Sequence, residues 1–136
     1  MMNRQEYATE SNRKRVLVVE DDTRAAHALR LMLRHWGFAV EMSTTLGDAM
    51  LMLKHHRPDV VLLDLMLPDG DGSRLLEHMH AQGMAGRVLV MTGSDDQKQL
   101  DKAMSMKPMG VLHKPVDLVE LMEQLERAVV KTKMAG

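Results

Sequence analysis

The sequence predicts an α/β protein built on a doubly wound, five-stranded parallel sheet with helices on both faces. The first observation is that short apolar runs alternate with longer segments of helical periodicity five times along the chain. The second is that these short runs are apolar without interruption, as in Val16-Leu17-Val18-Val19, which is typical of strands buried on both faces. Helices that join parallel strands make right-handed crossovers, so they come to cover the sheet.

The expected elements follow in order along the chain. Strands are predicted at 15–19, 38–42, 59–63, 87–91 and 110–113, and helices at 23–36, 45–56, 72–82, 96–106 and 117–131. We expect residues 1–13 to form a disordered lead, residues 14–131 one domain, and residues 132–136 a short tail. A chain of 136 residues is long enough to bury the core of one such domain.

Three of the helices show in the sequence which face covers the sheet. The first has apolar residues at helical spacing and a glycine stop: Ala26, Leu29, Leu33, Trp36 and then Gly37. The second has Leu46, Ala49, Met50 and Leu53 at the same spacing, before Pro58 ends it. The last helix has Asp117 as its expected N-cap. Its side chains expected to face the core are Leu118, Leu121, Met122, Leu125 and Val129.

Composition argues against several classes of function. The net charge is −1 with acids and bases interspersed, so we expect no direct contact with nucleic acid. The chain has no cysteine, which excludes disulfides and thiolate zinc sites. No apolar run approaches the length of a membrane span, and residues 1–15 lack the apolar segment of a secretory signal. We therefore expect a soluble, cytoplasmic protein that does not bind membranes.

Polar side chains follow four of the predicted strands. Glu20-Asp21-Asp22 follows the first, Asp64 the third, Thr92 the fourth and Lys114 the fifth. Because the carboxyl ends of parallel strands share one edge of a sheet, acids, a hydroxyl and an ammonium should converge there. Taken singly, each has an ordinary explanation: a solvated helix start, a strand-end cap, a turn residue and a surface lysine. Their joint occurrence at four strand ends favours a functional site.

These residues resemble the receiver domain of bacterial two-component response regulators, over residues 14–131. The resemblance rests on the acidic pair Glu20-Asp21, the aspartate Asp64, Thr92 and Lys114-Pro115, in the family's order and at about its spacing. It implies the flavodoxin-like strand order 2-1-3-4-5, with the site beside the first strand. It also implies a cis peptide bond between Lys114 and Pro115.

The resemblance further implies a phosphoryl transfer. Asp64 would accept the group from a sensor histidine kinase or a histidine phosphotransfer protein. Lys114 would pair with one phosphoryl oxygen, and the Thr92 hydroxyl would hydrogen-bond another.

A magnesium ion is the cofactor implied. By the family pattern, Asp21, Asp64 and the backbone carbonyl of Met66 would bind Mg²⁺ directly, and Glu20 through a water. The residues suit this hard cation, because they offer several acidic oxygens and no nitrogen-rich cluster. Asp22 is expected to be peripheral. The histidine pairs, at 55–56 and at 78 and 80, cannot share a helix face, so we expect ordinary surface histidines.

The expected function is a phosphorylation-controlled signalling switch that acts on a downstream protein effector and has no enzymatic output beyond its own phosphorylation and dephosphorylation. Met104 and Met106 lie two apart on one helix, so at least one should be exposed, where it could support a homodimer or a partner interface. Receivers commonly carry Tyr or Phe three residues before the lysine; here Val111 takes that place, which puts the usual route of activation in doubt.

Two alternatives stay open at this point. One is a magnesium-dependent phosphohydrolase with an aspartyl intermediate, although the second acid it would need two residues after Asp64 is replaced by Met66. The other is a non-phosphorylated pseudo-receiver that serves as a scaffold, against which the presence of Asp64, Thr92 and Lys114 argues.

Overall fold

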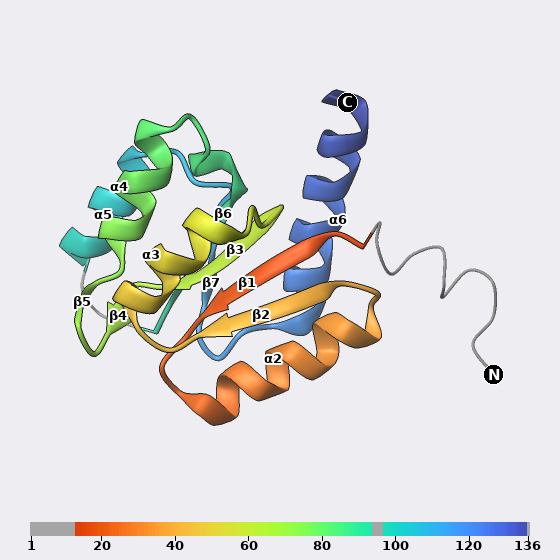
Figure 1. The fold of residues 1–136 in the computed structure, drawn as a ribbon, viewed down its shortest axis with the longest axis horizontal. Coiled ribbons are helices and arrows are strands. Elements are labelled where there is room, and N and C mark those ends of the chain that lie inside the picture. Colours follow the sequence, from red (N-terminus) through yellow and green to blue (C-terminus); the bar gives the residue numbers. More distant parts are fainter. Residues whose placement is uncertain (1–12, 94–96, 136) are drawn as a thin grey trace.

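The computed structural model describes residues 13–93 and 97–135. Its centre is a parallel sheet of five strands in the order β2-β1-β3-β6-β7, so both the predicted fold class and the order 2-1-3-4-5 are confirmed (Figure 1). The strands are β1 (Arg15–Val19), β2 (Ala39–Ser43), β3 (Val60–Asp64), β6 (Val88–Thr92) and β7 (Gly110–His113). The helices are α2 (Thr23–His35), α3 (Leu46–His55), α4 (Ser73–Ala81), α5 (Gln97–Ser105) and α6 (Leu118–Ala135).

The sheet divides the core into two layers. On one face, Leu17, Val61 and Val90 belong to the cluster that includes residues of α3, α4 and α5. On the other face, Val18, Leu62 and Leu89 belong to the cluster that includes residues of α2 and α6. Alternate residues of β1, β3 and β6 thus serve opposite layers, which explains why these three central strands are apolar over most of their length (Figure 1).

The register of the strands brings their carboxyl ends to one edge. Val19 pairs with both Ser43 and Leu63, and Asp64 pairs with Met91. Asp64 and Thr92 are the last residues of their strands, each one residue inside the strand rather than after it as predicted. Their side chains are therefore held by the sheet itself.

Several sequence-based expectations about the helices are confirmed. Gly37 follows α2 with φ of 97°, a conformation that glycine adopts without strain. Asp117 Oδ1 accepts hydrogen bonds from the backbone N–H groups of Val119 and Glu120, so this residue caps α6. Met104 is exposed and Met106 buried. Residues 1–12, which make up most of the expected lead, lie outside the described residues, as does the side chain of Val129.

Other details differ from the prediction. Leu118 was expected to face the core but is 41% exposed. It is the first residue of α6, and helical side chains lean toward the amino-terminal end, so it points past the start of the helix. The same helix continues to Ala135, beyond its expected end at residue 131, because no Gly or Pro interrupts it earlier.

Two short features were not predicted from the sequence. The loop after β3 contains a small antiparallel pair, β4 (Met66–Leu67) and β5 (Gly70–Asp71), and the 3-10 helix η1 (Ala85–Arg87) precedes β6. Each is too short to produce a periodic signal. Within the described ranges, none of the helices is long and apolar enough to cross a membrane.

Candidate functional site

Glu20 and its two acidic neighbours have different roles at the end of β1. The Glu20 N–H donates to Ser43 O of β2 at 3.0 Å, which extends the sheet by one residue and carries the side chain inward, where Glu20 is 1% exposed. Asp22 instead caps α2, because its Oδ1 accepts from the N–H groups of Arg24 and Ala25. Asp21 lies between them and is exposed. The expectation that Asp22 is peripheral agrees with this geometry.

Asp64 ends the central strand β3 and is buried. Its Oδ1 accepts a hydrogen bond from the Met66 N–H at 2.9 Å, across a tight turn of the backbone. The turn is held on its other side by Gly72, whose N–H donates to Leu65 O at 2.9 Å. Met66 is 63% exposed, and its backbone N–H is the group that faces the acid.

Lys114 brings a positive charge to the same place. The Lys114 N–H donates to Thr92 O at 2.7 Å, which ties the loop after β7 to the end of β6. The peptide bond from Lys114 to Pro115 is cis, as predicted. From there Lys114 Nζ reaches Glu20 Oε1 at 2.5 Å and Asp64 Oδ2 at 2.8 Å. Thr92 itself is buried at this edge.

Burial and mutual contact shift the pKa values of all three groups. Burial, helped by the neighbouring Asp64, raises the pKa of Glu20 to about 7, despite the contact with Lys114. Burial also opposes ionisation of Asp64, but the neighbouring Glu20 carboxyl, the Lys114 ammonium and the Met66 N–H together lower its pKa. The contacts with the two acids outweigh burial and raise the pKa of Lys114. Asp64 is thus the acid held ionised.

The chemistry of this edge fits a hard divalent cation. Glu20, Asp21 and Asp64 each offer a carboxylate oxygen, and these oxygens lie within 4.8 Å of one another. Glu20 Oε2 is buried and has no hydrogen-bond partner in the part of the chain that the structure describes. A buried carboxylate oxygen without a donor is unfavourable, and a cation bound to the cluster would relieve this. Oxygen ligands of this kind are those Mg²⁺ prefers.

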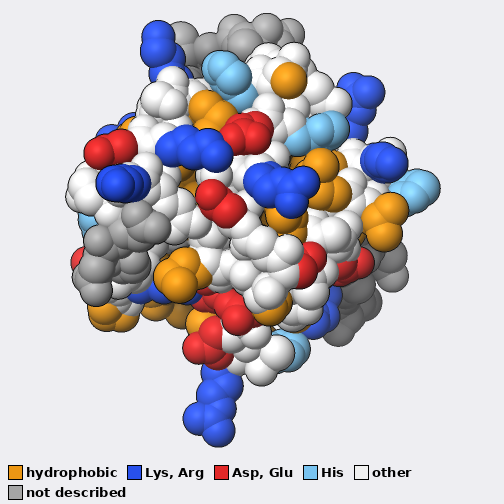
Figure 2. All heavy atoms as spheres, turned by 90° about the vertical axis from the view of Figure 1, so that its left-hand side faces the viewer, with side chains coloured by type: hydrophobic (Ala, Val, Ile, Leu, Met, Phe, Trp, Pro, Cys, Tyr) orange, Lys and Arg blue, Asp and Glu red, His pale blue; other side chains and the backbone are white. Residues whose placement is uncertain are grey.

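The structure therefore brings together Glu20, Asp21, Asp64 and Lys114, and it places Thr92 and the Met66 backbone at the same edge. Figure 2 views the molecule from the side on which β4 and β5 lie, and several acidic side chains gather in the lower part of this face. The histidines do not form a second centre: among the described residues, the one group of His or acidic side chains close enough to hold a metal is Glu20, Asp21 and Asp64.

Sequence reasoning missed three residues that shape the loop after Asp64. Asp69 accepts hydrogen bonds from the N–H groups of Leu46 and Gly47 and so holds the loop to the start of α3. Gly72 approaches the backbone of Asp64 so closely that an added Cβ would lie 2.4 Å from Asp64 O. Gln99 reaches this loop from α5. The only sequence signal among these was the turn composition Pro68-Asp69-Gly70.

Comparison with known proteins identifies the family. The profile of the response regulator receiver domain matches residues 16–126, which is most of the chain. The chain belongs to the response regulator receiver family. This confirms the resemblance inferred from the strand-end residues and places the protein among the receiver domains of two-component systems, which are regulatory modules rather than enzymes in general.

Relatives with longer chains share this domain. The receiver is 31% identical over 121 residues to the transcriptional regulatory protein ZraR of Salmonella typhimurium, covering 89% of this chain and 27% of that protein. It is 30% identical over 120 residues to the response regulator MprA of Mycobacterium ulcerans, covering 88% of this chain and 52% of that protein. The chain thus spans between about a quarter and about half of the length of these relatives.

Solved receiver structures have the same fold. A CheY-like response regulator receiver domain protein from Methanospirillum hungatei superimposes with a TM-score of 0.84 at 25% identity, covering 91% of this chain and 99% of that one. The signal receiver domain of a modulated diguanylate cyclase from Desulfovibrio desulfuricans gives a TM-score of 0.80 at 30% identity, with the same coverage.

Proposed function

We propose that this receiver accepts a phosphoryl group on Asp64, with Mg²⁺ bound, from the phosphohistidine of a sensor histidine kinase or a histidine phosphotransfer protein, and thereby changes a surface that a downstream protein reads. The observation that supports this most directly is the buried cluster in which Asp64 is held ionised by Lys114 and the Met66 N–H, beside Glu20. An ionised carboxylate at a site with a fixed cation is what attack on phosphorus requires.

In the proposed transfer, a carboxylate oxygen of Asp64 forms a bond to phosphorus while the bond from phosphorus to the partner's histidine nitrogen breaks. The electron pair of that bond stays on the imidazole. Lys114 Nζ lies 2.8 Å from Asp64 Oδ2 before the transfer. In the phosphorylated protein it would pair with one phosphoryl oxygen, and the Thr92 hydroxyl would donate a hydrogen bond to another. The Met66 N–H stays on the side of Oδ1.

Mg²⁺, when bound, would neutralise charge on the phosphoryl oxygens. The residues that would hold it are Asp21, Asp64 and the Met66 carbonyl, with Glu20 acting through a water. This assignment is supported by the shared position of the three carboxylates and by the buried Glu20 Oε2, which has no hydrogen-bond partner among the residues that the structure describes.

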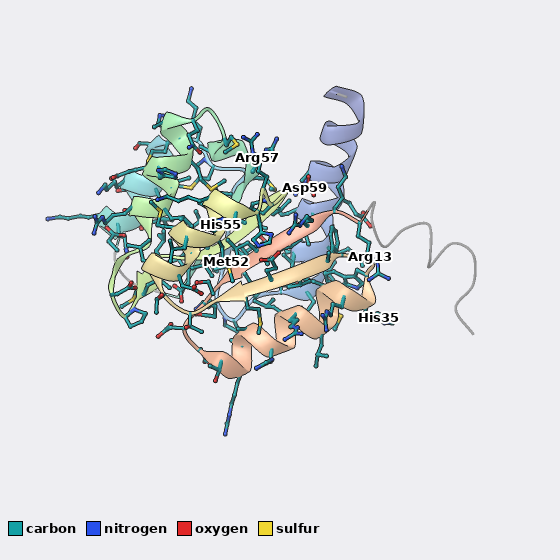
Figure 3. All side chains as sticks on the ribbon, viewed as in Figure 1. Arg13, His35, Met52, His55, Arg57 and Asp59 are labelled. Carbon is teal, nitrogen blue, oxygen red and sulfur yellow. The ribbon has the colours of Figure 1, made fainter. Side chains whose placement is uncertain are left out.

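The test is to incubate the protein with Mg²⁺ and a small phosphodonor such as acetyl phosphate and to follow its intact mass. We expect the mass increase of one phosphoryl group, lost slowly and absent in Asp64→Asn. Asp59→Asn is a matched control, because Asp59 precedes the same strand at the opposite end, where its Oδ2 accepts from the Arg15 N–H (Figure 3). The control should be phosphorylated like the parent.

Two other outcomes would contradict the proposal. Many turnovers of the donor without a stable adduct would indicate a phosphohydrolase. The absence of any adduct in the parent, with Mg²⁺ bound, would indicate a scaffold. A homodimer and the cytoplasmic location stay predictions, and the exposed Met104 on α5 is one side chain that such an interface could use.

A further inference from the structure

Gln99 connects helix α5 to the loop that carries the acceptor. Its Nε2 donates to Leu65 O at 2.7 Å and to Asp71 Oδ1 at 2.7 Å. A side-chain amide nitrogen has two hydrogens, so both are used in these two bonds. These contacts link residues that are 34 and 28 positions apart in the sequence. They join α5 to Leu65, just before β4, and to Asp71, at the end of β5.

The Leu65 carbonyl is part of the peptide that touches the acceptor. The N–H of that same peptide belongs to Met66 and donates to Asp64 Oδ1 at 2.9 Å. A peptide unit is planar, so a side chain that fixes the direction of its C=O also fixes the direction of its N–H. Gln99 and the Gly72 N–H hold this carbonyl together, the second at 2.9 Å.

Asp71 is the second acceptor of the Gln99 amide and strengthens the connection between α5 and the hairpin. Its Oδ1 also accepts from the Ser73 N–H at 2.9 Å, at the first residue of α4. Although burial opposes ionisation, the contacts with Gln99 and Ser73 lower the pKa of Asp71. The Gln99 amide therefore donates to an ionised acceptor, and such bonds are stronger than neutral ones.

The hairpin and α5 face each other across an open hollow. A surface hollow of about 510 Å³ lies between the hairpin and α5, lined by Leu67, Gly70, Lys98, Gln99 and Lys102 among others. Leu67 of the hairpin and Leu100 of α5 both pack against the core cluster that includes Ala103, and beside this apolar contact Gln99 joins the two elements by polar bonds. Gln99 is thus a polar bridge at the edge of this hollow.

We infer that Gln99 is a positioning residue: it holds the Leu65–Met66 peptide so that the Met66 N–H meets Asp64, and it passes a change in the charge of Asp64 on to α5. This rests on the proposed function insofar as phosphorylation supplies that change. A phosphorylated Asp64 carries less charge on its carboxyl oxygens and is a weaker acceptor for the Met66 N–H, so the peptide can tilt. The Leu65 carbonyl then moves relative to Gln99, and their hydrogen bond transmits this movement to α5.

The first experiment needs no phosphoryl group. Asp64→Asn weakens the acceptor permanently, and amide chemical shifts are measured by NMR at residues 97–105 of α5 in the Mg²⁺-free protein. We expect Asp64→Asn to shift these amides in the parent background and to lose most of that effect in Gln99→Met, which keeps the length of the side chain but has no amide. Equal shifts in both backgrounds would overturn the inference, as would no shift in the parent.

Gln97→Met is the matched control, because Gln97 is on the same helix and its Nε2 donates to Asp101 Oδ1 at 2.7 Å, within α5. It should leave the response of α5 to Asp64→Asn unchanged. Hydrogen exchange gives a second readout: the Met66 amide should exchange about fivefold faster in Gln99→Met, as expected for loss of one hydrogen bond's support, and at the parent rate in Gln97→Met. Equal rates in both variants would contradict the positioning role.

Failure of the link and failure of the proposed function are distinguishable. If the parent takes up no phosphoryl group but α5 still responds to Asp64→Asn through Gln99, the link stands and the phosphoacceptor role fails. If the parent is phosphorylated but α5 responds equally with and without the Gln99 amide, the phosphoacceptor role stands and the link fails.

Discussion

At the scale of single residues, Glu20 carries electrostatic strain, because the site disfavours its ionisation. It is almost fully buried, lies beside the ionised Asp64, and leaves one oxygen without a hydrogen-bond partner among the described residues. Lys114 offsets part of this strain, since its ammonium contacts both acids. One cation against a cluster of three carboxylates is an arrangement that calls for a second positive charge.

This strain gives the Mg²⁺-free protein a specific pH dependence. The folded protein holds the Glu20 proton up to a pKa of about 7, whereas an unfolded chain releases it near 4.5. Stability should therefore be highest below the lower value and should fall as pH rises through the higher one. We expect urea unfolding at about pH 5 and about pH 8 to differ by on the order of 1 to 3 kcal/mol more in the parent than in Glu20→Gln.

Glu120→Gln is the control for this measurement, because Glu120 is an exposed acid on α6. Its pH profile should follow that of the parent. The lowered pKa of Asp64 acts in a different window, since that group loses its stabilising effect only as pH falls below its ordinary value of 3.8. A parent profile that is flat between about pH 5 and pH 8 would show that Glu20 is not strained.

At the scale of elements, the loop between β3 and α4 does most to position the acceptor. Asp69 ties it to the start of α3, Gln99 ties it to α5, and Gly72 brings the start of α4 against the β3 backbone. The ties of Asp69 and Gln99 could not be foreseen, because they join residues 23 and 34 positions apart through a polar side chain. The tie at Gly72 is local, but it depends on the absence of a side chain, which gives no periodic signal. The strand-end residues could be foreseen, because parallel strands align their carboxyl ends whatever the loops do.

Helix α6 shows a second limit of prediction from the sequence. Its inward row at Leu121 and Leu125 follows from helical spacing and is observed, but Leu118 was wrongly extended into that row. Spacing gives the direction of a side chain around the helix axis, and not whether the sheet reaches that far along it. The place where α6 begins relative to the sheet depends on the loop that joins it to β7.

The close contact at Gly72 gives a test at this scale. Gly72 has φ of −58° and ψ of −23°, which alanine adopts readily, so Gly72→Ala carries no conformational penalty. Its cost is steric, because the new methyl group would lie 2.4 Å from Asp64 O and 2.9 Å from Leu65 Cα. We expect a loss of about 1 to 3 kcal/mol in the free energy of unfolding measured with urea.

Gly86→Ala is the comparison for this change. An added Cβ at Gly86 meets nothing within 4 Å, and the residue lies in the short helix η1. The substitution should be neutral or slightly stabilising, by less than about 1 kcal/mol, since it restricts the unfolded chain. Equal effects of the two substitutions would mean that α4 does not bear on the β3 backbone as described.

At the scale of the whole molecule, the sheet gathers like charges at one edge, and the fold must be stable with or without the ligand that offsets them. Three carboxylates converge there, while the two apolar layers hold the strands from both faces. The apolar core therefore offsets the repulsion between these carboxylates, which disfavours the folded state. Ligand binding at such a site is coupled to the global stability of the protein, because the unfolded chain has no such cluster.

This coupling leads to a prediction for Mg²⁺ and Asp21. We expect Mg²⁺ to raise the melting temperature of the parent by several degrees at saturation, since a ligand at about 100 times its Kd adds about 2.7 kcal/mol. Asp21→Asn removes one carboxylate of the cluster, so it should stabilise the Mg²⁺-free protein and lose most of the response to Mg²⁺. Asp22→Asn, next along the chain, should keep the response, because that residue caps α2 and asparagine caps as well as aspartate. Thermal unfolding of the three proteins with and without Mg²⁺ decides this: if Asp21→Asn changes neither quantity, the three acids do not act as one cluster.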